Sequence, residues 1–166
     1  MASSTQVPRF VRLGNLLTTT LLRAGVRITA PGGHPMYLLT VRGRKSGQPR
    51  TTPLVVLERA GQRYLVAPYG VVDWVRNLRA AGEATLTRGR RAELVRATEL
   101  PAGEAGRVLK QSLERGIPGF LQKYFAIAPD ASAEEYERAA QRHPVFCLES
   151  AQAQTRDTRP AAAARR

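Results

Sequence analysis

The chain has few of the residues that would mark it as a secreted, membrane-spanning or metal-binding protein. Its 166 residues include one cysteine, Cys147, so no disulfide can form within the chain. No apolar run approaches the roughly 20 residues that a membrane-spanning helix needs, and the N-terminus has neither region of a signal peptide. Neither histidine, His34 or His143, belongs to a set of three Cys, Asp or His residues at metal-ligand spacing. We therefore expect a cytoplasmic protein without a metal site.

Acidic residues are also scarce, and their distribution is uneven. The chain has 13 Asp and Glu against 26 Lys and Arg, which gives a net charge of +13. Residues 1–57 contribute +8 because no acidic residue precedes Glu58, whereas residues 58–149 contribute +2 and residues 150–166 contribute +3. Such a field favours anionic partners, namely nucleic acid, an acidic membrane surface or a polyanionic small molecule. Composition does not choose among them, and solubility alone accounts for such charge in other proteins.

Hydrophobic periodicity predicts short strands that are interrupted by helices. Helical spacing of apolar residues occurs in residues 7–24, 73–81, 103–115 and 132–141. Runs typical of strands occupy residues 36–42, 52–59, 63–67, 84–87, 93–97 and 144–149. Strands and helices do not alternate regularly, so the pattern favours an α+β antiparallel barrel of about six strands over a doubly wound parallel sheet.

Several residues indicate where these elements begin, turn or end. Asp73 is placed to cap the helix at 73–81, and Gly82 to end it. Gly25 is a plausible end for the first helix, and Ser132 with a glutamate three residues later forms a capping-box pattern. Residues 60–62, Ala-Gly-Gln, suit a hairpin connection.

The segment between the first two strands contains the most informative local pattern. Residues 43–47, Gly-Arg-Lys-Ser-Gly, place two cations, a hydroxyl group and two glycines in one loop, and Arg50 adds a third cation. Side-chain charge and accessible backbone N–H groups suit an anion. The spacing is wrong for a Walker A loop, and the Gly-x-Gly-x-x-Gly fingerprint is absent.

The stretch LLTVRGRKSGQPRTTPL at residues 38–54, followed by VAPYG at 66–70 and WVRNLRA at 74–80, resembles the deazaflavin-dependent nitroreductase family. The resemblance covers roughly residues 35–149. It implies a split β-barrel that binds coenzyme F-420, a 5-deazaflavin with a phosphodiester and an oligoglutamate tail. Residues 29–150 would form this coenzyme-binding domain, after an amphipathic helix and lead-in at 1–28 and before a disordered basic tail at 151–166. A polyanionic coenzyme agrees with the excess of Arg and Lys.

The resemblance also implies which residues contact the coenzyme. Phosphate and tail carboxylates would be held by Arg44, Lys45, Ser46, Gly47 and Arg50. The deazaflavin ring would lie against Thr52, Pro53, Leu54, Ala67, Pro68, Tyr69 and Gly70, with Trp74 as an apolar wall and Asn77 as a polar anchor. The sequence departs from the family just before Trp74, where the segment is shorter and carries Asp73.

The chemistry implied is hydride transfer from the reduced deazaflavin to an unsaturated or nitro-type small molecule, with a proton supplied separately. Tyr69, Tyr124 and Tyr136 are the candidate proton donors. Each choice has an ordinary alternative. The loop at 43–47 could be a solvated turn, Trp74 a core residue, Asn77 a surface amide, and the tyrosines packing residues.

Four other interpretations stay open at this point. The same architecture could bind flavin mononucleotide or haem. A basic nucleic-acid-binding barrel fits the charge, although the strands lack the interleaved aromatics that stack on bases. The N-terminal helix could lie on an anionic bilayer or cover the substrate pocket. A homodimer is the expected assembly, because pairing would bury a sheet edge.

Overall fold

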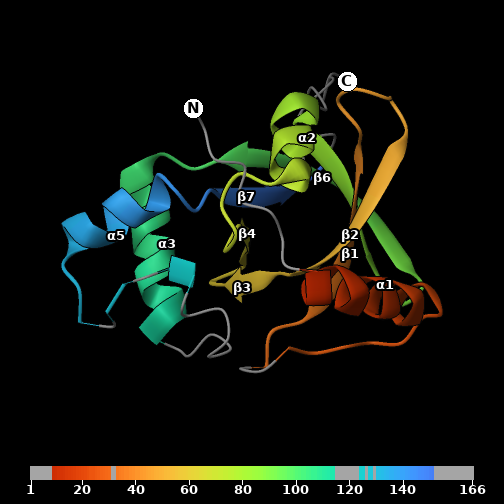
Figure 1. Ribbon diagram of the computed structural model, residues 1–166, viewed down its shortest axis with the longest axis horizontal. Coiled ribbons are helices and arrows are strands. Elements are labelled where there is room, and N and C mark those ends of the chain that lie inside the picture. Colours follow the sequence, from red (N-terminus) through yellow and green to blue (C-terminus); the bar gives the residue numbers. More distant parts are fainter. Residues whose placement is uncertain (1–8, 31–32, 115–123, 126, 129, 152–166) are drawn as a thin grey trace, which may run out of the picture.

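The computed structural model describes residues 9–30, 33–114, 124–125, 127–128 and 130–151 (Figure 1). The expected tail at 151–166 lies outside these residues except for Ala151. The described elements are, in chain order, α1 Arg9–Arg23, β1 Met36–Arg42, β2 Pro49–Val55, β3 Leu57–Arg59, β4 Gln62–Val66, α2 Asp73–Ala81, β5 Glu83–Arg88, β6 Arg91–Glu99, α3 Ala102–Glu114, α5 Ala133–Ala140 and β7 Val145–Ser150. Among the described helices, none is long and apolar enough to cross a membrane.

All seven strands belong to one antiparallel sheet with the order β2-β1-β5-β6-β7-β4-β3. The two edge strands of this order, β2 and β3, are separated in sequence by Val56 alone. A flat sheet would place its two edges far apart, so this connection requires the sheet to curl until the edges approach. The fold is therefore an α+β split barrel, as expected from the sequence.

The strand expected at residues 52–59 is wrong in its length, because it is two strands. Val56 is fully buried, and its N–H donates to the Pro35 carbonyl at 3.1 Å instead of to a neighbouring strand in the ladder. Residues 53–57 are all apolar, so the sequence pattern gives no sign of a break at Val56. The segment between the first two strands is also shorter than expected, since β2 begins at Pro49, not at residue 52, and pairs with β1 along its whole length.

Two hydrophobic clusters hold the barrel and its helices together. The first fills the curled sheet and includes Leu39, Leu65, Leu86 and Val95, with Trp74 from α2 packed among them. The second lies between α3, α5 and β7 (Figure 1), where Leu109 and the fully buried Tyr136 meet. The sheet thus has helix α2 at one side and the α3–α5 pair at the other.

Most helix ends follow the expected signals. The Gly25 N–H donates to the Leu22 carbonyl, and the Val26 N–H donates to the Leu21 carbonyl. Gly25 has φ 89°, so a residue in the left-handed conformation ends α1. Gly82 ends α2 in the same conformation, and the capping box of Ser132 with Glu135 is present at α5. The prediction that Asp73 caps α2 is wrong. Val72 is the N-cap without a side-chain hydrogen bond, which leaves the Asp73 carboxylate available to arginines.

We expect opposite effects from alanine at two glycines of α3. A Cβ at Gly106 would lie 2.9 Å from the Glu137 backbone nitrogen, where α5 crosses closely, whereas one at Gly103 would meet nothing closer than 4.0 Å. Gly106→Ala should therefore lower the free energy of unfolding by about 1–3 kcal/mol through overpacking. Gly103→Ala should raise it by about 0.5–1 kcal/mol through helix propensity. Urea unfolding measures both, and equal effects would contradict the close helix contact.

His143 should make stability depend on pH. Burial lowers the pKa of its imidazole below the usual value, against the opposing effect of a hydrogen bond to the Ala67 carbonyl. The folded state therefore binds fewer protons than the unfolded state, so the contribution is present above about pH 6.5 and is lost as the pH falls below it. Urea unfolding between pH 7 and 5 should show a decline that is shallower in His143→Gln. Parallel pH curves would refute this role.

Candidate functional site

The loop between β1 and β2 forms a compact turn that carries the basic residues. The Gly43 N–H donates to the Gln48 carbonyl and the Gly47 N–H to the Gly43 carbonyl, both at 2.8 Å. Gly47 has φ 67°, and a Cβ at Gly43 would lie 3.0 Å from the Gln48 oxygen, so both positions favour glycine. The two glycines of the motif therefore shape the loop that displays Arg44, Lys45 and Ser46.

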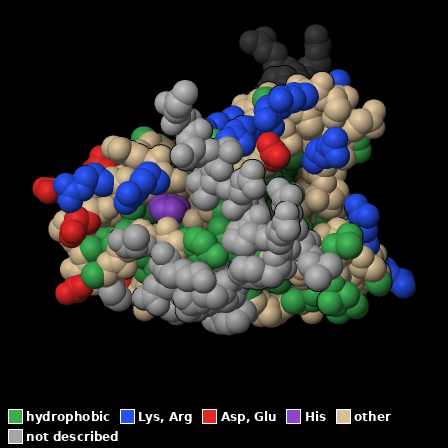
Figure 2. Space-filling model, in the orientation of Figure 1, with side chains coloured by type: hydrophobic (Ala, Val, Ile, Leu, Met, Phe, Trp, Pro, Cys, Tyr) green, Lys and Arg blue, Asp and Glu red, His purple; other side chains and the backbone are tan. Residues whose placement is uncertain are grey.

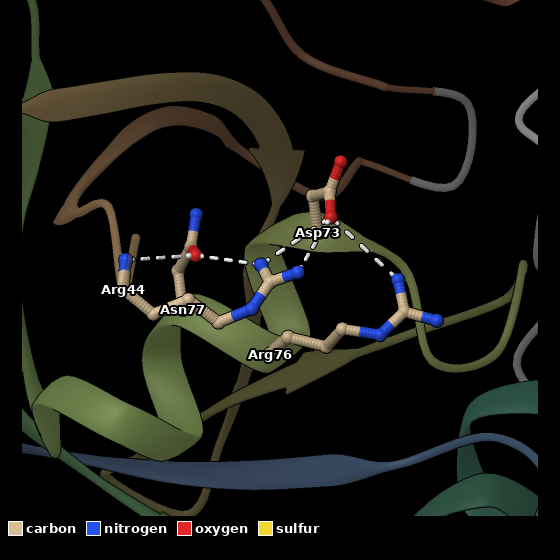
Figure 3. A network of polar contacts seen from close by, with 4 residues as sticks. All are labelled: Arg44, Asp73, Arg76 and Asn77. Atoms are coloured by element: carbon tan, nitrogen blue, oxygen red, sulfur yellow. Dashed lines mark hydrogen bonds and ion pairs between the residues drawn. The ribbon is translucent and has the colours of Figure 1, made fainter. Parts of the chain in front are cut away.

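This loop lies against α2 through a polar network around Asn77 (Figure 3). Asn77 Oδ1 accepts hydrogen bonds from the Arg44 backbone N–H at 3.2 Å and from Arg44 Nη1 at 3.0 Å. Asp73 Oδ1 lies 3.3 Å from Arg44 Nη1 and 3.6 Å from Arg76 Nη1. Asn77 is only 6% exposed, which rules out the surface-amide alternative and makes it the residue that fixes the loop to the helix.

A basic cavity of about 690 Å³ opens between this loop, β2 and α2. Its described lining consists of Arg23, Gly43, Arg44, Lys45, Ser46, Pro49, Arg50, Thr51, Thr52, Asp73, Trp74 and Asn77. Arginine and lysine outnumber acidic residues there four to one. Lys and Arg side chains gather around α2 in the upper part of Figure 2, on the same side of the molecule. Such a lining suits a ligand with several negative charges.

An apolar cavity of about 420 Å³ lies on the other side of Thr52 and Trp74, which line both cavities. Strands β2, β3 and β4, the segment after β4 and the start of α2 contribute Thr52, Pro53, Leu54, Val55, Leu57, Val66, Pro68, Tyr69, Val72 and Trp74. The remaining described lining residues are Val11, Gly14, Asn15, Thr18, His34, Met36, Leu109, Ser112, Leu113 and Phe125. None of these described residues is Asp, Glu, Lys or Arg, so a neutral flat molecule fits the chemistry of this space.

Helix α1 covers the apolar cavity with an unusual face. Gly14, Asn15 and Thr18 point toward the cavity, whereas Leu16 and Leu17 are 66% and 65% exposed. Hydrophobic side chains accordingly gather over the position of α1 at the lower right of Figure 2. The inward side of α1 therefore carries Gly14, Asn15 and Thr18 as well as the apolar Val11 and the buried Leu22, whereas Leu16 and Leu17 are directed to solvent.

The three tyrosines expected to act on the substrate occupy different environments. Tyr69 lines the apolar cavity, and the Tyr124 ring packs edge-on against it with centroids 4.7 Å apart. Burial, and to a smaller extent Tyr124, raise the pKa of the Tyr69 hydroxyl above its usual value. Tyr136 is fully buried between α3 and α5, where its hydroxyl donates to the Ala128 carbonyl at 3.4 Å. Tyr136 lines neither described cavity.

The loop after β4 is held from behind by His143. Its Nδ1 lies 3.3 Å from the Ala67 carbonyl oxygen, which can only accept, so Nδ1 carries the hydrogen. The Ala67 N–H donates to the Pro144 carbonyl and the Gly70 N–H to Ala67, which sets the turn. Pro68 and Tyr69 thereby face the apolar cavity, while Ala67 and Gly70 shape the turn without lining it.

Most of the expected coenzyme residues therefore converge on two adjoining cavities. The basic cavity gathers Arg44, Lys45, Ser46, Arg50, Thr52, Trp74 and Asn77, and the apolar cavity gathers Thr52, Pro53, Leu54, Pro68, Tyr69 and Trp74. Gly47 acts through the shape of its loop. Arg23 and the cavity side of α1 were not predicted, because the helical period of apolar residues does not say which side of the helix faces a cavity.

Comparison with known proteins agrees with this arrangement. A family model described as F420H(2)-dependent quinone reductase matches residues 18–128. No curated protein sequence matches the chain. Two similar solved structures are an F420-H2 dependent reductase, FDR-A, and a chain described as a domain-swapped dimer, at 22% and 23% identity. They cover 75% and 84% of this chain and 99% and 97% of their own, with TM-scores of 0.41 and 0.42.

The family match spans well over half of the chain and includes the loop at 43–47, the segment at 66–70 and helix α2. The expected membership of the deazaflavin-dependent reductases is thereby confirmed. The chain belongs to the F420H(2)-dependent quinone reductase family and is a deazaflavin-dependent oxidoreductase whose coenzyme is F-420.

Proposed function

We propose that the protein transfers a hydride from reduced coenzyme F-420 to a neutral, unsaturated or nitro-type acceptor held in the apolar cavity. The observation that carries this proposal is the junction of the two cavities at Thr52 and Trp74. A polyanionic tail and an uncharged reactive ring need opposite surroundings, and the chain offers both in contact with each other. The family description supports a quinone as one such acceptor.

The residues of the basic cavity fit the coenzyme's anionic part. Lys45, Arg50 and Arg23 would hold phosphate and carboxylate oxygens by charge-assisted hydrogen bonds, and the Ser46 hydroxyl would add a neutral donor. Arg44 is oriented by Asn77 and Asp73 before any ligand arrives. Such preorganisation lowers the entropy lost on binding.

The residues of the apolar cavity would position the ring and the acceptor. When bound, the reduced coenzyme supplies the hydride. Thr52, Pro53, Leu54, Pro68 and Trp74 line this cavity and would contact the ring. Burial beneath α1 excludes water and strengthens the interactions that stabilise negative charge on the acceptor. Tyr69 is the candidate tyrosine that lines this cavity, and Tyr124 supports it by ring packing.

Binding measurements test this function against its rivals. We expect oxidised F-420 to bind tightly when followed by its own fluorescence, and flavin mononucleotide to bind more weakly. Reduced F-420 should then reduce quinones, enones or nitro compounds. Selective binding of flavin mononucleotide or haem would change the chemistry. Specific nucleic-acid binding that persists at about 150 mM salt, with no affinity for F-420, would contradict the proposed reductase function and favour a nucleic-acid-binding protein.

The outward face of α1 favours a second role, peripheral contact with an anionic membrane. Leu16 and Leu17 are exposed on this helix. The helix lies within residues 1–57, which contain no acidic residue. A bilayer would cover the leucines and attract the surrounding cations. A second copy of the chain, in a homodimer, is the alternative partner for this face. One similar solved structure is described as a domain-swapped dimer.

Loss of either of two cations should weaken coenzyme binding. Lys45→Ala and Arg50→Ala each remove a charge from the basic cavity, so we expect each to reduce affinity for F-420 by about 1–3 kcal/mol. Arg107→Ala removes the same charge from an exposed position of α3 that lines neither described cavity and is the matched control. Fluorescence titration measures all three, and equal affinities would refute the placement of the anionic tail.

Polar substitutions on α1 should weaken vesicle binding. We expect the double variant Leu16→Gln/Leu17→Gln to bind vesicles of phosphatidylglycerol roughly tenfold less well, because two exposed apolar side chains are lost. Leu94→Gln, at a residue 44% exposed on β6, is the control. Sedimentation with vesicles measures binding, and light scattering measures the oligomer. A change in mass without a change in pelleting would assign this face to a dimer.

A further inference from the structure

His34 is a titratable residue of the apolar cavity that the sequence analysis considered only as a metal ligand. It lies just before β1, in a turn where the Ala30 N–H donates to the His34 carbonyl at 2.8 Å and Thr29 bridges to Pro35. The backbone is thus held at both sides of the residue. The half-buried imidazole lines the cavity and has no hydrogen-bond partner among the described residues.

The surroundings of His34 contain few other groups that exchange protons. Helix α1 faces it with Asn15 and Thr18, and α3 contributes Ser112, whose hydroxyl already donates to the Val108 carbonyl at 2.6 Å. The remaining described lining from β1, β2, β3, the β4–α2 segment and Phe125 is uncharged, and Tyr69 is its one other titratable group. The charged residues Arg23, Arg44, Lys45, Arg50 and Asp73 line the adjoining basic cavity, beyond Thr52 and Trp74.

The chemistry of the proposed reaction needs a proton as well as a hydride. An acceptor such as a quinone becomes anionic when it gains a hydride, and this charge is costly in a cavity without cations. Imidazole changes charge near neutral pH, whereas burial makes the Tyr69 hydroxyl a weaker acid than a free phenol. Of the two groups, His34 is therefore the better matched donor.

We propose that the His34 imidazolium donates the proton to the acceptor oxygen that becomes negative during reduction. The acceptor gains a hydride and a proton and is reduced by two electrons, the deazaflavin is oxidised by two electrons, and His34 is left neutral until water returns a proton. This proposal rests on the proposed function, and it makes His34 a catalytic residue. It predicts that the cavity binds an anion shaped like the reduced acceptor more tightly than its neutral counterpart.

The anion preference can be measured on the full chain without coenzyme. The probes are 2-hydroxy-1,4-naphthoquinone, which is anionic at neutral pH, and neutral 2-methyl-1,4-naphthoquinone. Trp74 is the one tryptophan of the chain and lines the cavity, so its fluorescence reports binding. We expect the anionic probe to bind the wild type at least tenfold more tightly at pH 6 than at pH 8. His34→Gln should abolish this dependence, and Tyr69→Phe should retain it.

Proton NMR supplies a second readout. The chain has two histidines, and His34→Gln identifies the resonance of His34. Its titration midpoint should move to higher pH when the anionic probe binds, because the anion stabilises the imidazolium. With reduced F-420, kcat of the wild type for the neutral quinone should decline at high pH. In His34→Gln this kcat should be at least tenfold lower and should not decline at high pH, while F-420 affinity stays unchanged.

The outcomes separate this proposal from the proposed function. If wild type binds F-420 but His34→Gln keeps the same anion preference and pH profile, His34 is not the donor. If Tyr69→Phe alone removes the pH dependence, the proton comes from Tyr69. If neither naphthoquinone binds the wild type, the acceptor site is wrong and the role of His34 falls with it. Failure to bind F-420 would overturn the proposed function itself.

Discussion

The short connection between β2 and β3 is the constraint on which the rest of the structure depends. Because Val56 alone separates the two edge strands of the sheet, the sheet must curl, and the curl creates the interior that Trp74 and the strand residues fill. The same strand β2 begins beside the basic loop and ends beside the apolar cavity. One continuous stretch of backbone therefore runs from the charged part of the site to the uncharged part.

The contact between Arg44 and Asn77 fixes the position of the basic loop relative to α2. A buried amide that accepts from both the backbone and the guanidinium of one residue holds the loop at a defined distance from α2. Asp73 then orients the arginine from an exposed position, where the ion pair itself contributes little to stability. The value of this network is positional, because it holds the loop cations beside α2 where an anion can reach them.

The sequence was sufficient for the parts of the site that depend on local residue types. The strand at 36–42 and the helix at 73–81 match the structure in both bounds, because apolar period and flanking glycines agree there. The basic loop was predictable because glycines and cations stand together in it. The break at Val56 was not predictable, since residues 53–57 are all apolar and fit one uninterrupted strand. The cavity side of α1 was not predictable either, because tertiary packing decides which side of a helix meets the core, and apolar residues lie on both sides of this one.

Helix α1 contributes to the two cavities of the site unequally. Among the residues that the structure describes, it contributes four to the apolar cavity and only Arg23, at its last position, to the basic one. The residues expected to recognise the coenzyme come instead from β2, α2 and the loops beside them. Substitutions along residues 11–18 would therefore reshape the apolar cavity, which we propose as the acceptor site, without touching the described lining of the basic cavity. Under this proposal, variation of one peripheral helix changes the acceptor while the barrel and the coenzyme's anionic site stay as they are.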